Sequence, residues 1–237
     1  MPETAIPKRL EELLLRFGGE VIKNVAGYDV ARWMTGAFGT LGVLLDVSLK
    51  VLPAPRAQCS RAPELDPASA VQRVRAWAQR PLPISATAIL DGRLIVRFSG
   101  AESAVAAAEA EIGGEIVDDA FWLALREHEL AFFADPRPLW RLSVAPATPL
   151  ADLDGAQLIE WHGALRWLKS DADAARLRAW AAAAGGHAML FRAGAGGVPA
   201  DGVFHPLAPG LLALHRRLKA QFDPHAIFNR GVMYAGL

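Results

Sequence analysis

The sequence predicts an α+β protein in which helices cover one face of an antiparallel sheet, and three observations support this prediction. Hydrophobic residues make up 52% of the 237-residue chain, which is enough to bury a sizeable core. Beyond residue 67, helical patterns alternate with paired strand-like runs, and this alternation is typical of an antiparallel sheet covered by helices. Pro53, Pro55, Pro63 and Pro67 interrupt a polar stretch, so residues 53–67 are expected to form a linker between two domains.

The segment before the linker is expected to form a strand, a helix and a second strand. Residues 13–17 form a short strand-like run that is followed by two glycines, and residues 26–35 have a helical pattern. Residues 43–52 form an apolar run that ends at Pro53, so we expect the second strand there.

After the linker, each expected element follows from its hydrophobic period. The expected helices are Ala68–Gln79, Glu102–Ile112, Ala120–Phe132, Asp171–Ala184 and Gly210–Phe222. The expected strands are Ile84–Leu90, Arg93–Phe98, Leu139–Val144, Gln157–Trp161, Ala164–Leu168 and His187–Phe191. The helix that begins near Asp171 is the best delimited, because Asp suits an N-cap and Gly185-Gly186 suits a stop.

Charge and cysteine content exclude several classes of protein. Lys and Arg together number 25, as do Asp and Glu, so no bulk charge would attract nucleic acid. Cys59 is the only cysteine, which excludes an internal disulfide and a cysteine-ligated iron–sulfur cluster and suits the reducing cytoplasm. No apolar run approaches the roughly 20 residues of a membrane-spanning helix, so we expect at most peripheral association with the inner face of the membrane.

A glycine-rich segment gives the strongest functional signal. Six glycines lie between Gly18 and Gly42. Glycine allows a ligand to approach the main chain, and amide groups at a helix start can bind a pyrophosphate. The alternative is a set of tight turns, because neither the P-loop nor the Rossmann pattern is present.

The order of residues in this segment resembles a known family. The motif Lys23-Asn24-Val25-Ala26-Gly27-Tyr28-Asp29 is followed by Gly36 and Gly39-Thr40-Leu41-Gly42, and Phe222 to Gly231 reads FDPHAIFNRG. Both motifs resemble the FAD-linked oxidases of the vanillyl-alcohol oxidase type, which share the p-cresol methylhydroxylase (PCMH) fold. Within that family they are most similar to the FAD-binding E subunits of glycolate oxidase.

The resemblance implies a set of FAD-binding residues: Lys23, Asn24, Gly27, Tyr28, Asp29, Arg32, Gly36, Gly39, Thr40, Gly42, Val43 and Asn229. Arg230 stands where the family more often has proline, which makes the turn at Asn229 less rigid. Relative to the family, the chain is expected to be N-terminally truncated and to lack an Arg-Gly-Gly-Gly-like pyrophosphate loop. We therefore expect FAD in the intact subunit but no retention of FAD, and no activity, in this chain alone.

The resemblance also implies three regions. Residues 1–55 are expected to be the second half of a PCMH-type FAD-binding domain, and residues 56–204 a cap domain on the substrate side. Residues 205–237 are expected to form a tail that returns to the flavin side.

The cap region carries only weak catalytic candidates. The family's D subunits have a His-x-x-Gly-Asp-Gly-Asn-x-His motif that can hold a metal, whereas the similar position here begins at His187 and lacks both the Asp-Gly-Asn and the second histidine. No metal is therefore expected. His187 could accept a hydroxyl proton while Arg192 binds a carboxylate, the alternative being that both only support the strand.

The function implied by the resemblance is the oxidation of glycolate to glyoxylate. Electrons would pass through flavin to the iron–sulfur F subunit, with the D subunit as a further partner. The alternative is a non-catalytic assembly module that has an incomplete flavin site and docks the D subunit. Self-association is expected as well, because residues 13–17 and 43–52 would leave an open strand edge.

Overall fold

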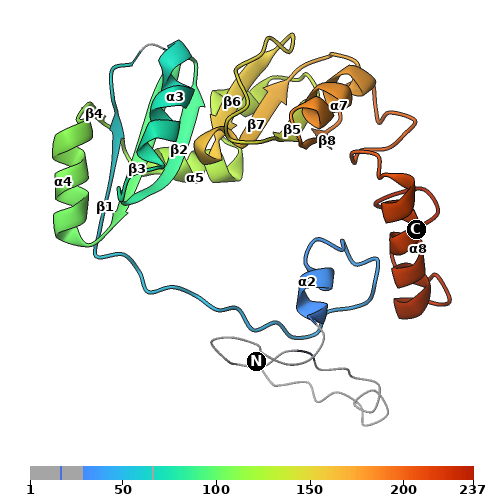
Figure 1. Cartoon of the computed structure of the whole chain (residues 1–237). Helices are drawn as coiled ribbons and strands as arrows, with labels where there is room; N and C mark the ends of the chain where they lie inside the picture. Colours follow the sequence, from blue (N-terminus) through green and yellow to red (C-terminus); the bar gives the residue numbers. More distant parts are fainter. Residues whose placement is uncertain (1–16, 18–28, 66) are drawn as a thin grey trace. The chain divides into compact units, whose positions relative to one another are not determined.

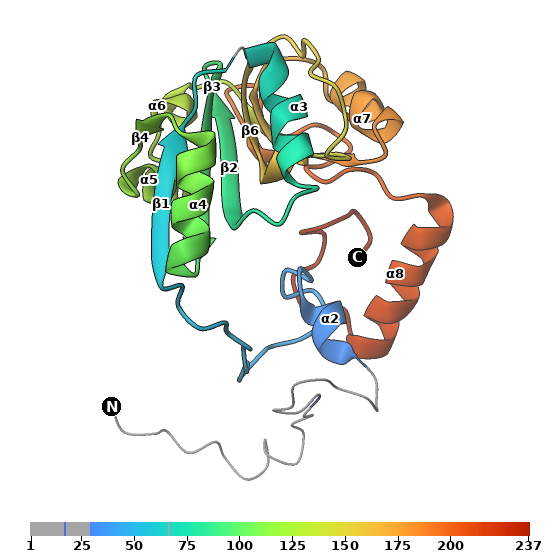
Figure 2. The same cartoon turned by 60° about the vertical axis from the view of Figure 1, so that its left-hand side comes forward.

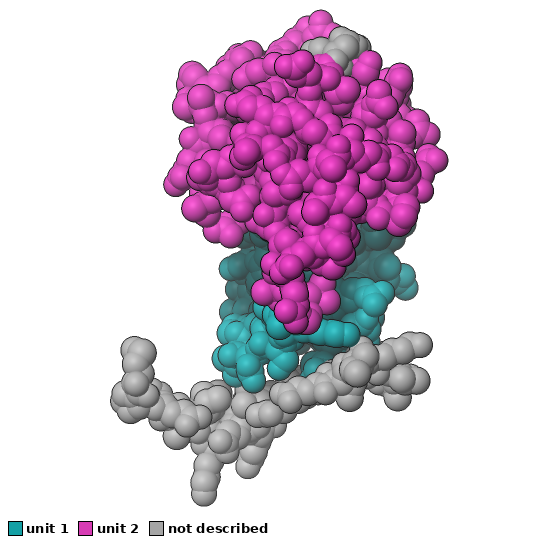
Figure 3. All heavy atoms as spheres, turned by 90° about the vertical axis from the view of Figure 1, so that its left-hand side faces the viewer, with its two compact units in different colours: residues 1–51, 207–237 teal, residues 52–206 magenta. Residues whose placement is uncertain are grey.

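The structure is a computed structural model that describes residues 17, 29–65 and 67–237. Two compact units make up the chain (Figure 3): unit 1 comprises Met1–Val51 with Leu207–Leu237, and unit 2 comprises Leu52–Pro206. Unit 2 is therefore continuous in sequence, whereas unit 1 is formed by the two segments that flank it. No helix among the described residues is long and apolar enough to cross a membrane.

Unit 2 is built on an eight-stranded antiparallel sheet with the strand order β4-β1-β3-β2-β6-β7-β5-β8 (Figure 1). Its strands are β1 (Ala57–Ala62), β2 (Ile84–Leu90), β3 (Arg93–Gly100), β4 (Glu115–Ile116), β5 (Leu139–Ser143), β6 (Ala156–Glu160), β7 (Leu165–Lys169) and β8 (His187–Arg192). The predicted α+β class and antiparallel sheet are confirmed.

Helices cover both faces of this sheet, so the prediction that only one face is covered is wrong. On one face, buried residues of α3 (Pro67–Trp77) and α4 (Glu102–Ile112) pack against β3, and those of α7 (Ala174–Ala183) pack against β5 and β7. On the other face lie α5 (Ala120–Glu127) and α6 (Ala131–Ala134) (Figures 1 and 2). The central strands therefore have buried apolar residues on both sides of the sheet, as β3 does with Leu94 and Val96 on one side and Ile95 on the other.

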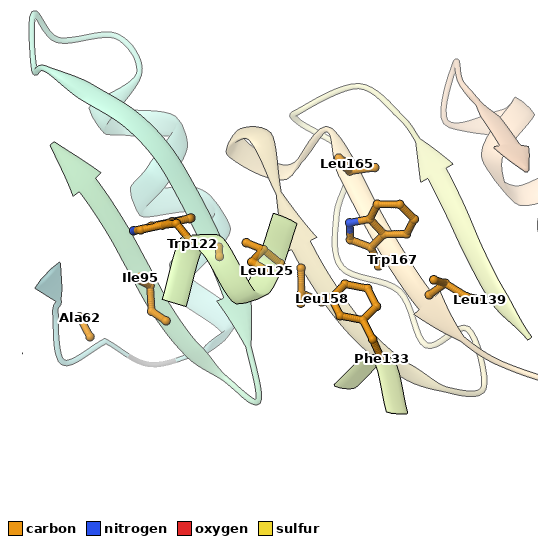
Figure 4. Close-up of a cluster of buried hydrophobic side chains, with 10 residues drawn as sticks. Ala62, Ile95, Trp122, Leu125, Phe133, Leu139, Leu158, Leu165 and Trp167 are labelled. Carbon is orange, nitrogen blue, oxygen red and sulfur yellow. The ribbon is translucent and has the colours of Figure 1, made fainter. Parts of the chain in front are cut away.

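The core beneath α5 and α6 is rich in large side chains. Figure 4 shows Trp122 and Leu125 of α5 and Phe133 of α6 facing side chains of the sheet, among them Leu158 and Trp167. The Trp122 indole N–H also donates to Ser60 Oγ of β1 at 2.8 Å, so this buried ring has a partner for its polar atom.

Several boundaries differ from those predicted. The expected linker contains β1, which pairs with β3 and β4. The expected helix Ala120–Phe132 is interrupted at His128, whose φ of 62° is left-handed and ends α5. The N-cap of α7 is Asp173 rather than Asp171, because the Asp173 carboxylate accepts from the amides of Ala175 and Arg176.

The described part of unit 1 contains two helices, α2 (Val30–Met34) and α8 (Pro209–Phe222). The Trp33 and Phe222 rings meet edge to face, with centroids 6.1 Å apart. The strand expected over residues 43–52 is absent from the structure, where these residues pair with no described strand. The strand predicted at residues 13–17 lies outside the described residues, apart from Phe17.

Candidate functional site

The two motif-bearing segments of the chain meet in unit 1. Asn229 donates a hydrogen bond from its Nδ2 to the Phe38 carbonyl at 2.7 Å, across 191 positions of sequence. The glycine-rich segment and the Phe222–Gly231 motif therefore form one local structure.

The main chain at Gly39 also lies close to Asn229. Its φ is +69°, and a Cβ added there would lie 2.7 Å from Asn229 Nδ2. A side chain at position 39 would therefore meet both backbone strain and a steric clash. Asn229 itself has a φ of 36°, a left-handed conformation that asparagine tolerates better than most residues.

Lys219 of α8 connects the glycine-rich segment to the Phe222–Gly231 motif. Its ammonium group donates to Thr40 O at 2.7 Å, to Phe228 O at 2.6 Å and to the Asp223 carboxylate at 2.7 Å. The Lys219 residue is 7% exposed, and these three acceptors match the three donors of its ammonium group. A buried charge is thus fully paired, and it joins the glycine-rich segment to the motif that carries Asn229.

Asp223 organises the turn that follows α8. Its carboxylate accepts the amides of Ile227 and Phe228, both at 2.9 Å, as well as the Lys219 ammonium. Burial alone would raise the pKa of Asp223, but these hydrogen bonds outweigh it and lower the pKa to about 2. The carboxylate therefore stays ionised and fixes the backbone that leads to Asn229.

Sequence reasoning missed Lys219 and Asp223 as functional residues. Their spacing of i, i+4 on a helix could have indicated the ion pair. The carbonyl partners of Lys219 could not be inferred, since no pattern in the sequence points to a backbone oxygen.

The other predicted FAD-binding residues fall into three groups. Lys23, Asn24, Gly27 and Tyr28 lie outside the described residues. Asp29 caps α2 by accepting the Arg32 amide at 3.3 Å, and it forms an exposed ion pair with the Arg32 side chain.

The third group lies on the glycine-rich segment itself. Gly36, with a φ of +78°, and Gly42 have no atom within 4 Å of an added Cβ, so the main chain is open at both. The Thr40 hydroxyl is buried and donates to Ala37 O at 2.7 Å, while Val43 is 69% exposed. The open main chain therefore flanks Gly39 on both sides.

The two cap-domain candidates are not brought together. His187 begins β8 and Arg192 ends it, which separates their Cα atoms by roughly 16 Å. Burial and, secondly, the charge of Arg141 lower the pKa of His187. Arg192 Cζ lies 6.0 Å from the centroid of the Phe191 ring, at the other end of the strand.

Cys59 and the acidic residues offer no metal site in the described part of the chain, where no group of three or more potential ligands occurs. Cys59 is part of β1, and its Sγ lies 3.8 Å from Glu109 Oε2. Burial raises the pKa of this thiol, which keeps it protonated at neutral pH.

Comparison with known proteins adds to this geometry. No protein-family model matches the chain. The glycolate oxidase subunit GlcD of Bacillus subtilis (strain 168) is 43% identical over 42 residues, 18% of this chain and 9% of that protein. A D-lactate dehydrogenase of Anaerostipes hadrus is 38% identical over 47 residues, 20% of this chain and 10% of that protein. Both matches are confined to a short segment of the chain, and they show similarity to FAD-linked oxidoreductases over that segment alone.

One relative matches nearly the whole chain. The glycolate oxidase subunit GlcE of Escherichia coli (strain K12) is 49% identical over 223 residues, which is 94% of this chain. The chain is a homologue of GlcE, and the resemblance predicted from its motifs is confirmed. The matched region spans 62% of the length of that relative.

Proposed function

We propose that the chain serves as the FAD-binding subunit of a glycolate oxidase complex, and that the contact between Gly39 and Asn229 forms part of the flavin-binding wall. The observation that carries this proposal is the meeting of the two motif segments at the Asn229 to Phe38 hydrogen bond. Its direct support is the homology to a protein named as a glycolate oxidase subunit.

The residues present suit a flavin. The main chain is open at Gly36 and Gly42, so a flat ligand can approach its amide groups closely. Asn229 uses its Nδ2 on Phe38, which leaves its Oδ1 without a partner among the described residues and able to accept from a ligand N–H. Thr40, Val43 and the N-terminal residues of the motif, Lys23, Asn24, Gly27 and Tyr28, complete the proposed set, together with Asp29 and Arg32.

The bound flavin would supply two-electron redox chemistry, and the residues of this chain would bind and orient it. Lys219 and Asp223 would act indirectly by holding Thr40 and Asn229 in place. In the proposed complex, glycolate is oxidised to glyoxylate with the D subunit as partner, and the iron–sulfur F subunit receives the electrons. The proposed location is the cytoplasm or the inner face of the membrane.

A second candidate is an assembly module that docks the D subunit without a working flavin. The observation that favours it is the exposure of the apolar residues from Val43 to Leu52, which are between 57% and 86% exposed. Contiguous exposed apolar side chains commonly mark a protein–protein interface. The same surface supports the expected self-association.

FAD content separates the two candidates. We expect the chain purified alone to retain no stoichiometric FAD, and the chain co-purified with its D and F subunits to contribute a flavin. Gly39→Ala should abolish that flavin without preventing assembly, whereas Gly210→Ala, in an open position of α8, should leave it unchanged. An assembled complex whose flavin content is insensitive to Gly39→Ala would favour the assembly module.

A further inference from the structure

Arg141 lies at the centre of β5, which pairs with β7 on one side and β8 on the other. Its side chain is half-buried, and its guanidinium makes no hydrogen bond or ion pair with any residue that the structure describes. Half-buried guanidinium groups elsewhere in unit 2 have acceptors, as in the ion pair of Arg61 with Glu109. Five N–H donors are thus left for a ligand.

The Trp161 ring forms one wall beside this guanidinium. Arg141 Cζ lies 5.9 Å from the ring centroid, and Trp161 is 62% exposed. Trp161 follows β6 in a left-handed conformation with a φ of 50°, and the next amide, that of His162, donates to Thr87 Oγ1 at 3.0 Å. The backbone is therefore fixed where it presents an exposed aromatic face, next to an unpaired cation.

His187 lies on the same face of the sheet. Met189 is directly opposite Arg141 and His187 is directly opposite Ser143, so Arg141 and His187 are diagonal neighbours. Diagonal neighbours on one face lie within reach of long side chains, and the charge of Arg141 acts on the His187 ring. Neither ring nitrogen of His187 has a hydrogen-bond partner among the described residues, so a neutral imidazole is available to a hydroxyl group.

Glu160 lies close enough to Arg141 for their charges to interact, but it forms no ion pair with it. Its Oε1 accepts the Trp167 indole N–H at 2.6 Å; burial raises the pKa of this carboxyl, whereas the hydrogen bond from Trp167 and the charge of Arg141 lower it. The Glu160 carboxyl is thus engaged by Trp167, and no ion pair joins it to Arg141. The cation remains available for an external anion.

We propose that Arg141, Trp161 and His187 form a binding site for a small carboxylate that carries a neighbouring hydroxyl group, with Arg141 as the carboxylate-binding residue. A guanidinium can hold a carboxylate through two parallel hydrogen bonds. His187 then meets the hydroxyl, and the Trp161 ring covers the apolar side of the ligand. The choice of a 2-hydroxy acid over other carboxylates rests on the proposed function.

This assignment replaces Arg192 as the partner of His187. Arg192 is at the far end of β8, whereas Arg141 is one strand away and acts directly on the imidazole. The sequence could not show this, because Arg141 and His187 are 46 positions apart in the chain and become neighbours only through the pairing of β5 with β8.

Isothermal titration of the full 237-residue chain with glycolate tests the proposal. We expect glycolate to bind, the uncharged glycolamide to bind far more weakly, and Arg141→Met to weaken glycolate binding about tenfold or more. Arg192→Met should bind as the unchanged chain does. Arg97→Met is the matched control, since Arg97 also lies over a tryptophan, Trp122, at 5.3 Å but donates to Ser85 Oγ.

The absence of glycolate binding at millimolar concentration would overturn the proposal, as would equal affinity in Arg141→Met or a larger loss in Arg192→Met. Arg141→Lys keeps the positive charge but cannot form the two parallel hydrogen bonds to a carboxylate, so an intermediate loss of glycolate affinity is expected. This variant tests the proposal even if Arg141→Met fails to fold. The FAD content of the complex tests the flavin-binding role separately. A complex that contains FAD although the unchanged chain binds no glycolate would reject this site and leave the proposed function standing.

Discussion

At the scale of single residues, the site in unit 1 depends on a few polar contacts rather than on a large apolar core. Lys219 and Asp223 are 7% and 3% exposed; they bind each other, and together they bind four backbone groups near the motif. Removing one partner of such a pair leaves the other buried and unpaired, which is more harmful than losing an exposed ion pair.

Asp223 predicts a specific response to acid. Its pKa of about 2 in the folded chain is below the ordinary value of 3.8 for an aspartate, so its contribution to stability is full above about pH 4 and is lost as the pH falls through about 2. Asp223→Asn should remove this part of the acid transition and weaken unit 1 already at neutral pH.

Fluorescence of Trp33, which contacts Phe222 at the end of α8, is the appropriate probe. Other carboxylates also titrate at low pH, among them Asp135, whose pKa is also about 2. Both the unchanged chain and Asp223→Asn keep Asp135, so the difference between their acid transitions is due to Asp223. Identical acid transitions in the two proteins would contradict the assigned role of Asp223.

The motif residues could be predicted from sequence, but their contacts could not. Gly39 and Asn229 belong to recognisable patterns, and the structure brings them together. Lys219 binds the Thr40 carbonyl 179 positions away, and lysine at a helix surface gives no indication of such a partner.

At the scale of elements, the strongly periodic segments were predicted well. The strand Ile84–Leu90 and the helix Glu102–Ile112 have the predicted bounds, because their apolar residues follow the strand and helix periods clearly. The strand β1 was missed because its sequence AQCSRA has little apolar alternation and lies between prolines. Pairing with β3 and β4 makes it a strand, and that tertiary effect is not visible locally.

The segment from residue 43 to 52 shows the opposite error. Its apolar run, which ends at Pro53, predicts a strand, yet no described strand pairs with it. A strand needs a neighbour to satisfy its backbone, so a correct local pattern is insufficient.

The packing of α7 on the sheet predicts the cost of one core substitution. Leu142 of β5 is fully buried among Trp140, Leu168 and Leu177. Leu142→Ala should reduce the free energy of unfolding by about 2–5 kcal/mol through lost burial and the cavity left behind. Leu123→Ala, at a residue of α5 that is 50% exposed, is the matched control and should change it by about 0.5 kcal/mol or less. Urea denaturation measures both, and equal effects would contradict the assigned core.

At the scale of the whole molecule, the two units have different surfaces. Unit 2 has three clusters of buried apolar side chains, whereas unit 1 exposes Trp33, Phe38, Ile227 and the apolar residues from Val43 to Val51. An apolar surface of this kind favours association with another protein or with a second copy of the chain.

Self-association should therefore depend on the exposed segment. Each apolar side chain buried on association contributes roughly 1.5–3 kcal/mol, so a few can offset the entropic cost of pairing. Val47→Lys combined with Leu49→Lys should shift the chain toward monomer in sedimentation velocity at micromolar concentration. Ile116→Lys, which places the same charge at a 72% exposed residue of β4, should not. A monomeric unchanged chain would show the prediction to be wrong.

The division of unit 1 into two segments has a consequence during translation. Residues 52–206 leave the ribosome as one continuous unit that can fold while synthesis proceeds. The Thr40 carbonyl, in contrast, cannot accept its hydrogen bond until Lys219 has been synthesised. At about 5–20 residues per second, the 179 intervening positions correspond to roughly 10–35 s. Throughout that interval the apolar residues from Val43 to Leu52 have no completed unit around them. The glycine-rich segment can therefore reach its final conformation only after α8 has emerged, which makes the joining of the two segments of unit 1 a late step in folding.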